Sequence, residues 1–100
     1  MNDRVYFKVF THSKGRLVAV CDIDLVGETF RDGKLKLDVK PEFYKGASSN
    51  IEDVLREIAA ADTANLVGEK IIEAAVREGL VDPSAIVRIA GIPHVQIVRL

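Results

Sequence analysis

Two consecutive segments near the start of the chain, residues 5–10 and 16–21, most constrain the fold. The first is rich in β-branched and aromatic residues, and the second contains Leu-Val-Ala-Val-Cys, which is apolar at every position. A strand that is apolar on both faces is usually covered on both, so the second segment is predicted to be a central strand. The polar residues between the two segments end in Gly15, which suits a short hairpin loop. The two segments are therefore predicted to pair.

After this hairpin the pattern changes. Residues 22–28 indicate a short helical turn that Gly27 closes in a left-handed conformation. Residues 29–31 are predicted to pair briefly, and Asp32-Gly33 is a strong turn signal. Residues 34–39 then alternate polar and apolar side chains, which predicts a half-exposed strand. Its inward residues are expected to be Leu35, Leu37 and Val39.

Helical periodicity dominates the middle of the chain. Residues 49–52 read Ser-Asn-Ile-Glu, the form of a capping box, and apolar residues at helical spacing follow. These features predict a helix over residues 50–61. A second helix is predicted over residues 64–78, with Asp62-Thr63 as its N-cap and Gly79 after its end. The sequence leaves open whether the two helices are continuous.

At the C-terminal end, Asp82-Pro83 predicts a single helical turn, and residues 86–90 and 95–100 predict a hairpin around Gly91-Ile92-Pro93.

One hundred residues, of which 48% are hydrophobic, fit one domain and one core. We therefore predict a single α+β domain over residues 1–100. It is expected to have a mixed or antiparallel sheet, two helices packed on that sheet, and a C-terminal hairpin.

Composition and motifs exclude several classes of function. The net charge of −1 gives no strong field for nucleic acid or membranes. The phosphate-loop, dinucleotide-binding, zinc-protease and serine-hydrolase motifs are absent, and one Cys with two His cannot build a structural zinc site. We therefore expect no cofactor and no metal. A lone cysteine and the lack of a long apolar run indicate a cytoplasmic protein without a signal peptide or membrane span.

Five residues are candidates for a ligand pocket. His94 and Gln96 point to one face of a predicted strand, and Asn65 is a polar residue in the mostly apolar second predicted helix, where it needs hydrogen-bond partners. With Glu69, and with Cys21 beside them, they would form a site able to hold a small molecule. A structural role is the competing interpretation for each: a backbone-bonded hairpin residue for His94, packing for Asn65, and a small core residue for Cys21.

Gly68 and an acidic cluster after the second segment are two further local features. Gly68, which is costly within a helix, indicates close approach of another backbone or of a ligand. Asp22, Asp24 and Glu28 form an acidic cluster that suits Mg²⁺ in principle. Solvated carboxylates at a helix N-terminus are the preferred interpretation of that cluster.

Basic residues concentrate in the first half of the chain, where nine Lys and Arg face seven Asp and Glu. Interleaved basic and aromatic residues are typical of RNA-binding surfaces, although a solvated sheet face has the same pattern. The aromatic residues nearby are Tyr6, Phe43 and Tyr44. The candidate nucleic-acid-binding residues are Lys8, Lys34, Lys36, Lys40 and Lys45.

Four stretches resemble a family of short archaeal proteins, domain-of-unknown-function family 424. The resemblance implies an archaeal cytoplasmic protein and covers nearly the whole chain, but it brings no established activity, substrate or catalytic residue. The stretches that carry it are Cys21-Asp22 with Leu25 and Gly27, Ala-Asn-Leu-Val-Gly-Glu at 64–69, Gly-Leu-Val-Asp-Pro at 79–83, and Gly-Ile-Pro-His-Val-Gln-Ile-Val at 91–98.

Three functional hypotheses follow. The first is a non-catalytic binding module that serves RNA or a ribonucleoprotein. The second is a small enzyme or ligand-binding protein with a pocket around Asn65, Glu69, His94 and Gln96. The third is a partner subunit or homodimer that uses the apolar excess of the second predicted helix.

Overall fold

The computed structural model of the chain describes residues 3–99, and its fold is α+β as predicted. A six-stranded mixed sheet has the order β5-β1-β2-β6-β8-β7, in which only β2 and β6 pair in parallel. The segment 16–21 lies in β2, between β1 and β6, so its central position is confirmed. The strands of this sheet are β1 (Arg4–His12), β2 (Gly15–Asp22), β5 (Ala47–Asn50), β6 (Thr63–Val67), β7 (Val87–Ile89) and β8 (Ile92–Val98).

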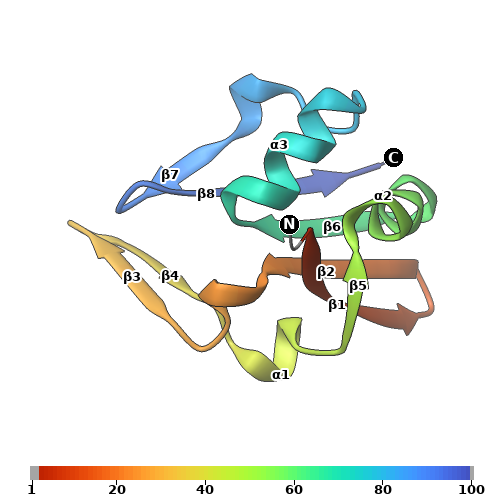
Figure 1. The fold of residues 1–100 in the computed structure, drawn as a ribbon, viewed down its shortest axis with the longest axis horizontal. Coiled ribbons are helices and arrows are strands. Elements are labelled where there is room, and N and C mark those ends of the chain that lie inside the picture. Colours follow the sequence, from red (N-terminus) through yellow and green to blue (C-terminus); the bar gives the residue numbers. More distant parts are fainter. Residues whose placement is uncertain (1–2, 100) are drawn as a thin grey trace.

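Two helices, α2 (Ile51–Ala60) and α3 (Glu69–Arg77), cover one face of the sheet (Figure 1). Their apolar stripes face every second residue of β1, β2, β6 and β8, because side chains alternate along a strand. The buried centre of this layer includes Val18, Leu66, Ile58 and Ile71. The apolar excess of the segment around 64–76 is therefore largely buried within the chain itself.

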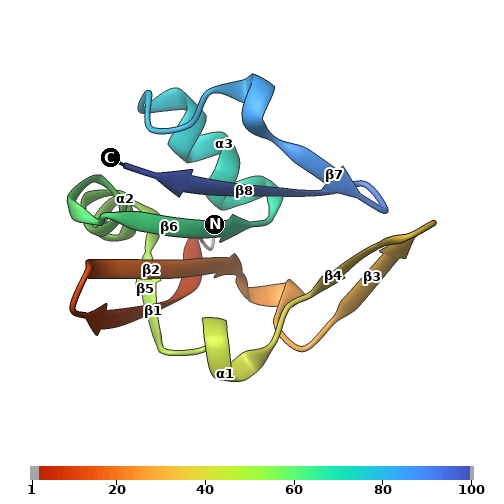
Figure 2. The ribbon, with the colours of Figure 1, turned by 180° about the vertical axis from the view of Figure 1, so that it is seen from behind.

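The opposite face of the sheet is only partly covered. The 3-10 turn η1 (Ile23–Leu25), the hairpin of β3 (Thr29–Asp32) and β4 (Leu35–Asp38), and the short helix α1 (Pro41–Tyr44) follow β2. Leu37, Val39 and Tyr44 from this segment pack on Ala19 and Cys21 of β2. Figure 2 shows that no helix or strand of residues 3–99 lies in front of the middle of β6 and β8. We call this uncovered surface of β6 and β8 the open face.

The predicted helix over 64–78 is wrong in its first part, because Thr63–Val67 form the strand β6 and α3 begins at Glu69. Between β2 and β8, these residues bond to a neighbouring strand on each side and bury Ala64 and Leu66 under the helices. Tertiary pairing therefore overrides the local helical pattern. Asp62-Thr63 does not cap a helix; an Asp62 carboxylate oxygen accepts a hydrogen bond from the N–H of Arg16 at 2.8 Å.

Gly68 joins β6 to α3 with a φ of +117°, in the left-handed region that favours glycine. A Cβ at this position would collide with the carboxylate of Asp22. The close approach that the sequence indicated at Gly68 is therefore made by a side chain of the same domain.

The structure also bears on several smaller predictions. Asn50, not Ser49, caps α2, and its Oδ1 accepts a hydrogen bond from the N–H of Asp53 at 2.9 Å. Leu35 was expected to face inward, but it is 52% exposed because it lies beside the turn of the β3–β4 hairpin, which projects to one side of the molecule (Figure 1). The C-terminal hairpin turns at Ala90-Gly91, so His94 lies inside β8. The turn at Asp82-Pro83, η2 (Pro83–Ala85), is confirmed.

Candidate functional site

The open face holds a pocket of about 290 Å³, which combines residues from the floor of the sheet with a wall from β4 and α1. We call it the open-face pocket. It brings together three of the five predicted ligand-binding residues, namely Asn65, His94 and Gln96. Its lining residues are Leu37, Asp38, Lys40, Phe43, Tyr44, Asn65, His94 and Gln96.

Strand register places the polar floor residues together. Asn65 of β6 and Gln96 of β8 are Cα partners in the antiparallel pair, and His94 lies two residues before Gln96. Directly opposite residues point to the same face of a sheet, so their two carboxamides are neighbours. No hydrogen bond joins the side chains of Asn65, His94 or Gln96 to another residue in the described part of the chain. The floor therefore presents polar groups that a ligand can use.

His94 is half-buried, and this burial lowers the pKa of its imidazole below the ordinary value of 6.5. The imidazole is therefore neutral at pH 7, with one nitrogen that donates and one that accepts a hydrogen bond. Together with two carboxamides, it gives the floor both donors and acceptors without a net charge.

Phe43 and Tyr44 of α1 form the aromatic part of the pocket wall. Phe43 of α1 stacks on Phe10 of β1, with ring centroids 5.2 Å apart and an interplanar angle of 19°. The rings of Tyr44 and Phe43 are nearly perpendicular, with their centroids 4.9 Å apart. Burial raises the Tyr44 pKa to about 12, so its hydroxyl stays protonated at neutral pH. These contacts hold the Phe43 ring in place beside the polar floor.

The candidate lysines fall into two groups. Lys40 lines the pocket, while Lys8 and Lys45 flank α1. The Lys8 ammonium donates a hydrogen bond to the carbonyl of Glu42 at 2.8 Å and lies 5.4 Å from the Phe10 centroid. The Lys45 ammonium lies 5.6 Å from the Tyr6 centroid. Lys34 and Lys36 belong to the second group, at the turn and on β4 of the projecting hairpin, and do not line the pocket.

Glu69 and Cys21 do not line the open-face pocket. A Glu69 carboxylate oxygen accepts a hydrogen bond from the Arg88 guanidinium at 2.6 Å. Cys21 is fully buried beneath the β3–β4 and α1 cover. Burial, followed by the nearby charges of Asp22 and Asp24, raises the pKa of its thiol to about 12. The Cys21 side chain is therefore a protonated core residue at neutral pH.

The acidic cluster is divided by the fold. Asp22 is 5% exposed, and its two carboxylate oxygens accept hydrogen bonds from the N–H groups of Lys70 at 2.9 Å and Ile71 at 3.1 Å. The expectation that this carboxylate is solvated is wrong, because it is buried against the first turn of α3. Asp24 and Glu28 stay exposed. Residues 3–99 contain no group of His, Cys, Asp or Glu side chains suited to a metal.

Sequence reasoning did not select Leu37 or Asp38 as parts of the site. They lie on the wall because β4 and the start of α1 fold back over β2. Asp38 accepts a hydrogen bond from the Thr29 hydroxyl at 3.3 Å. The alternating pattern of 34–39 indicated a strand, but nothing local in it indicated that this strand would lie opposite β8.

Comparison with known proteins identifies the family. A family model described as "Protein of unknown function (DUF424)" matches residues 10–100. The chain belongs to this family. The DUF424 chain is also similar to a solved structure, an uncharacterized conserved protein from Methanopyrus kandleri. The two share 26% sequence identity with a TM-score of 0.78, over 94% of this chain and 90% of that one. No curated protein matches the chain.

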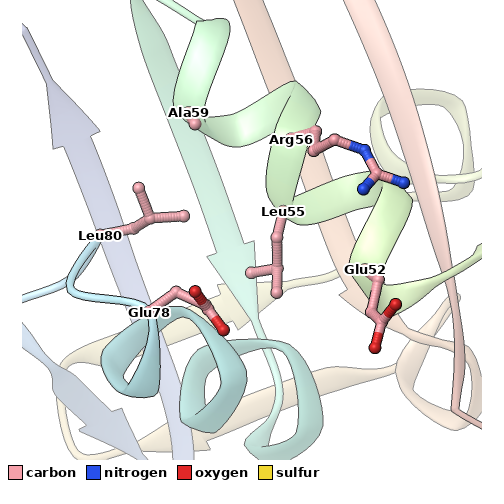
Figure 3. Close-up of a pocket in the computed structure, with 6 residues that line it drawn as sticks. All are labelled: Glu52, Leu55, Arg56, Ala59, Glu78 and Leu80. Carbon is pink, nitrogen blue, oxygen red and sulfur yellow. The ribbon is translucent and has the colours of Figure 1, made fainter.

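The DUF424 chain has another concavity on its helical side, of about 410 Å³ (Figure 3). Leu55 of α2 and Leu80, which follows α3, face one another there, with Glu52, Arg56 and Glu78 around them. Arg56 is already paired with Asp53 of its own helix. This hollow contains none of the residues that the sequence selected.

None of the helices within residues 3–99 is long and apolar enough to cross a membrane.

Proposed function

We propose that the chain is a non-catalytic, cytoplasmic protein that binds single-stranded RNA across the open face. The observation that carries this proposal is the open-face pocket, where three polar side chains without hydrogen-bond partners among residues 3–99 lie beside a fixed aromatic ring and a lysine. Proteins that bind single strands combine these elements, because bases stack on aromatic rings while basic side chains follow the phosphates.

The aromatic wall supports the stacking part of this proposal. Phe43 is half-buried and held by Phe10 and Tyr44, so little conformational freedom is lost when a base packs on it. Stacking of a base on an aromatic side chain contributes about 1–3 kcal/mol. The open side of the pocket leaves room for the chain of a nucleic acid to continue past the bound base.

The nearby lysines support the electrostatic part. Lys8, Lys40 and Lys45 lie at or next to α1, on the side of the pocket that Phe43 forms. Phosphates crossing this edge would displace counterions, so affinity would fall as salt concentration rises.

The arrangement favours binding over catalysis. His94 has no hydrogen bond to a carboxylate within residues 3–99, and the Cys21 thiol is buried and protonated. A general base normally needs a second group that orients it, and a thiol nucleophile needs a lowered pKa. The pocket has neither arrangement.

The test is fluorescence anisotropy with a short, labelled RNA of mixed sequence, measured across a range of salt concentrations. Each phosphate contact to a single strand contributes about −0.7 to the slope of log affinity against log salt. The double variant Lys40→Gln/Lys45→Gln should therefore bind more weakly and show a slope reduced by up to about 1.4.

The control is Lys14→Gln/Arg77→Gln, which removes the same charge from the β1–β2 turn and from α3. It should bind RNA like the unchanged protein. Equal losses in both double variants would show that net charge alone drives binding. Absence of RNA binding by the unchanged protein would contradict the proposal.

A further inference from the structure

We infer that the open-face pocket selects adenine, through paired hydrogen bonds from Asn65 and Gln96 to the edge of the base. This inference rests on the proposed RNA-binding function and adds to it the identity of the base. It follows from the hydrogen-bonding chemistry of the floor, the register of β6 and β8, and the size of the pocket.

The floor has the hydrogen-bonding groups that complement adenine. A carboxamide carries an N–H donor and a C=O acceptor side by side, and it pairs with the adjacent ring nitrogen and amino group of adenine. Adenine alone among the four bases has an acceptor ring nitrogen on each side of its amino group, so two carboxamides can pair with it at once, whereas cytosine offers only one such edge. The charged lining residues, Asp38 and Lys40, come from the wall and not from the β6–β8 floor.

The strand register sets the spacing of these groups. Directly opposite residues in an antiparallel pair have Cβ atoms about 4.5–5.5 Å apart, so the amides of Asn65 and Gln96 can both reach one planar base. His94 lies two residues from Gln96 along β8, about 7 Å away by strand geometry. Its neutral imidazole supplies one further donor and one acceptor next to the amide pair.

The dimensions of the pocket limit the occupant. Its volume of about 290 Å³ lies near the lower end of the roughly 300–1,000 Å³ usual for ligand pockets. One nucleotide is therefore the largest unit that the pocket encloses. With the base edge at the floor and its face toward Phe43, Lys40 is the cation in the lining that can meet the phosphate.

The experiment compares the affinities of labelled oligo(A), oligo(C) and oligo(U) of equal length, and of free AMP and CMP by calorimetry. The unchanged protein should bind oligo(A) about tenfold more tightly than the other two. Asn65→Asp replaces the amide donor with a second acceptor, which suits the amino group of cytosine. This variant should lose the preference for oligo(A) and gain affinity for oligo(C), with the salt dependence unchanged.

Asn50→Asp is the matched control, because it makes the same chemical change at the cap of α2, away from the pocket. It should keep the preference for oligo(A). If Asn65→Asp does not fold, Gln96→Glu makes the corresponding change at an exposed position and carries the same expectation.

The outcomes separate this inference from the proposed function. Lysine-dependent binding of all three oligonucleotides with equal affinity, or a preference for another base, would overturn adenine selection and leave RNA binding intact. Binding of AMP over CMP without RNA binding would retain the adenine pocket and contradict the RNA function. Failure of every ligand to bind would overturn both.

Discussion

His94 shows how position in the fold changes the chemistry of one side chain. It lies half-buried in β8, and desolvation lowers the pKa of its imidazole below 6.5. In the unfolded chain the imidazole is free to take up a proton near its ordinary pKa. The folded state therefore binds this proton less readily than the unfolded state does, so the stability of the protein depends on pH through His94.

The sign of this linkage gives a prediction. Because the folded-state pKa is lowered, the contribution of His94 to stability is complete above pH 6.5 and is lost as the pH falls through the folded-state value. Urea unfolding should show that the unchanged protein loses more stability on acidification from pH 8 to pH 5 than His94→Gln does. The His12→Gln variant keeps His94 and should follow the unchanged protein. Equal losses in His94→Gln and the unchanged protein would contradict this account.

At the scale of elements, Asp22 ties the end of β2 to the beginning of α3. Its carboxylate accepts hydrogen bonds from two N–H groups in the first turn of the helix, which would otherwise have no partner within the helix. Burial raises the pKa of Asp22, and these two hydrogen bonds oppose that rise. Gly68 makes the contact possible because it has no Cβ at the point where the carboxylate lies.

Asp22→Asn should therefore destabilise the protein. An asparagine offers only one oxygen in place of two, so one of the N–H groups of Lys70 and Ile71 would face an amide donor. The expected loss in unfolding free energy at pH 7 is about 1–3 kcal/mol, the usual cost of a buried polar group without a partner. Urea denaturation measures it.

The matched control for this prediction is Asp24→Asn, the same change at an exposed position two residues along the chain. It should leave the unfolding free energy nearly unchanged. An equal effect of both substitutions would show that local charge, and not the capping contact, accounts for the loss.

At the scale of the whole molecule, the sheet separates two apolar layers of unequal extent. The helical layer is continuous, whereas the layer on the other side covers β2 and leaves the middle of β6 and β8 open. Cys21 lies in this second layer, with no exposed surface. Its thiol is therefore a reporter of how well α1 and the β3–β4 hairpin stay packed on the sheet.

We expect a thiol reagent at pH 8 to label Cys21 only as fast as the whole domain unfolds, because the side chain is buried and its pKa is raised to about 12. The protection free energy from the labelling rate should equal the unfolding free energy from urea. An added exposed thiol, Ala59→Cys on α2, should react in a separate fast phase. Labelling of Cys21 well above the global rate would show that the second layer opens on its own.

Local patterns in the sequence were sufficient for much of the fold. The first hairpin, α2 and the turn at Asp82-Pro83 were predicted because their signals depend on neighbouring residues: alternation, capping and glycine placement. The centrality of β2 followed from its uninterrupted apolar run. For the site, the sequence selected Asn65 by its residue type within a wrongly predicted helix, and His94 and Gln96 by strand spacing, and these three line one pocket.

The remaining features depend on contacts between distant residues. Whether Thr63–Val67 forms helix or strand was decided by the hydrogen bonds that β2 and β8 offer on either side. Glu69 lies at the start of α3, which covers the other face of the sheet, and the fold-back of α1 added Phe43 as a wall. The sequence by itself determined which residues have polar, aromatic or apolar chemistry. Only the tertiary structure decided which of them meet, because strand register and the packing of α1 are properties of long-range contacts.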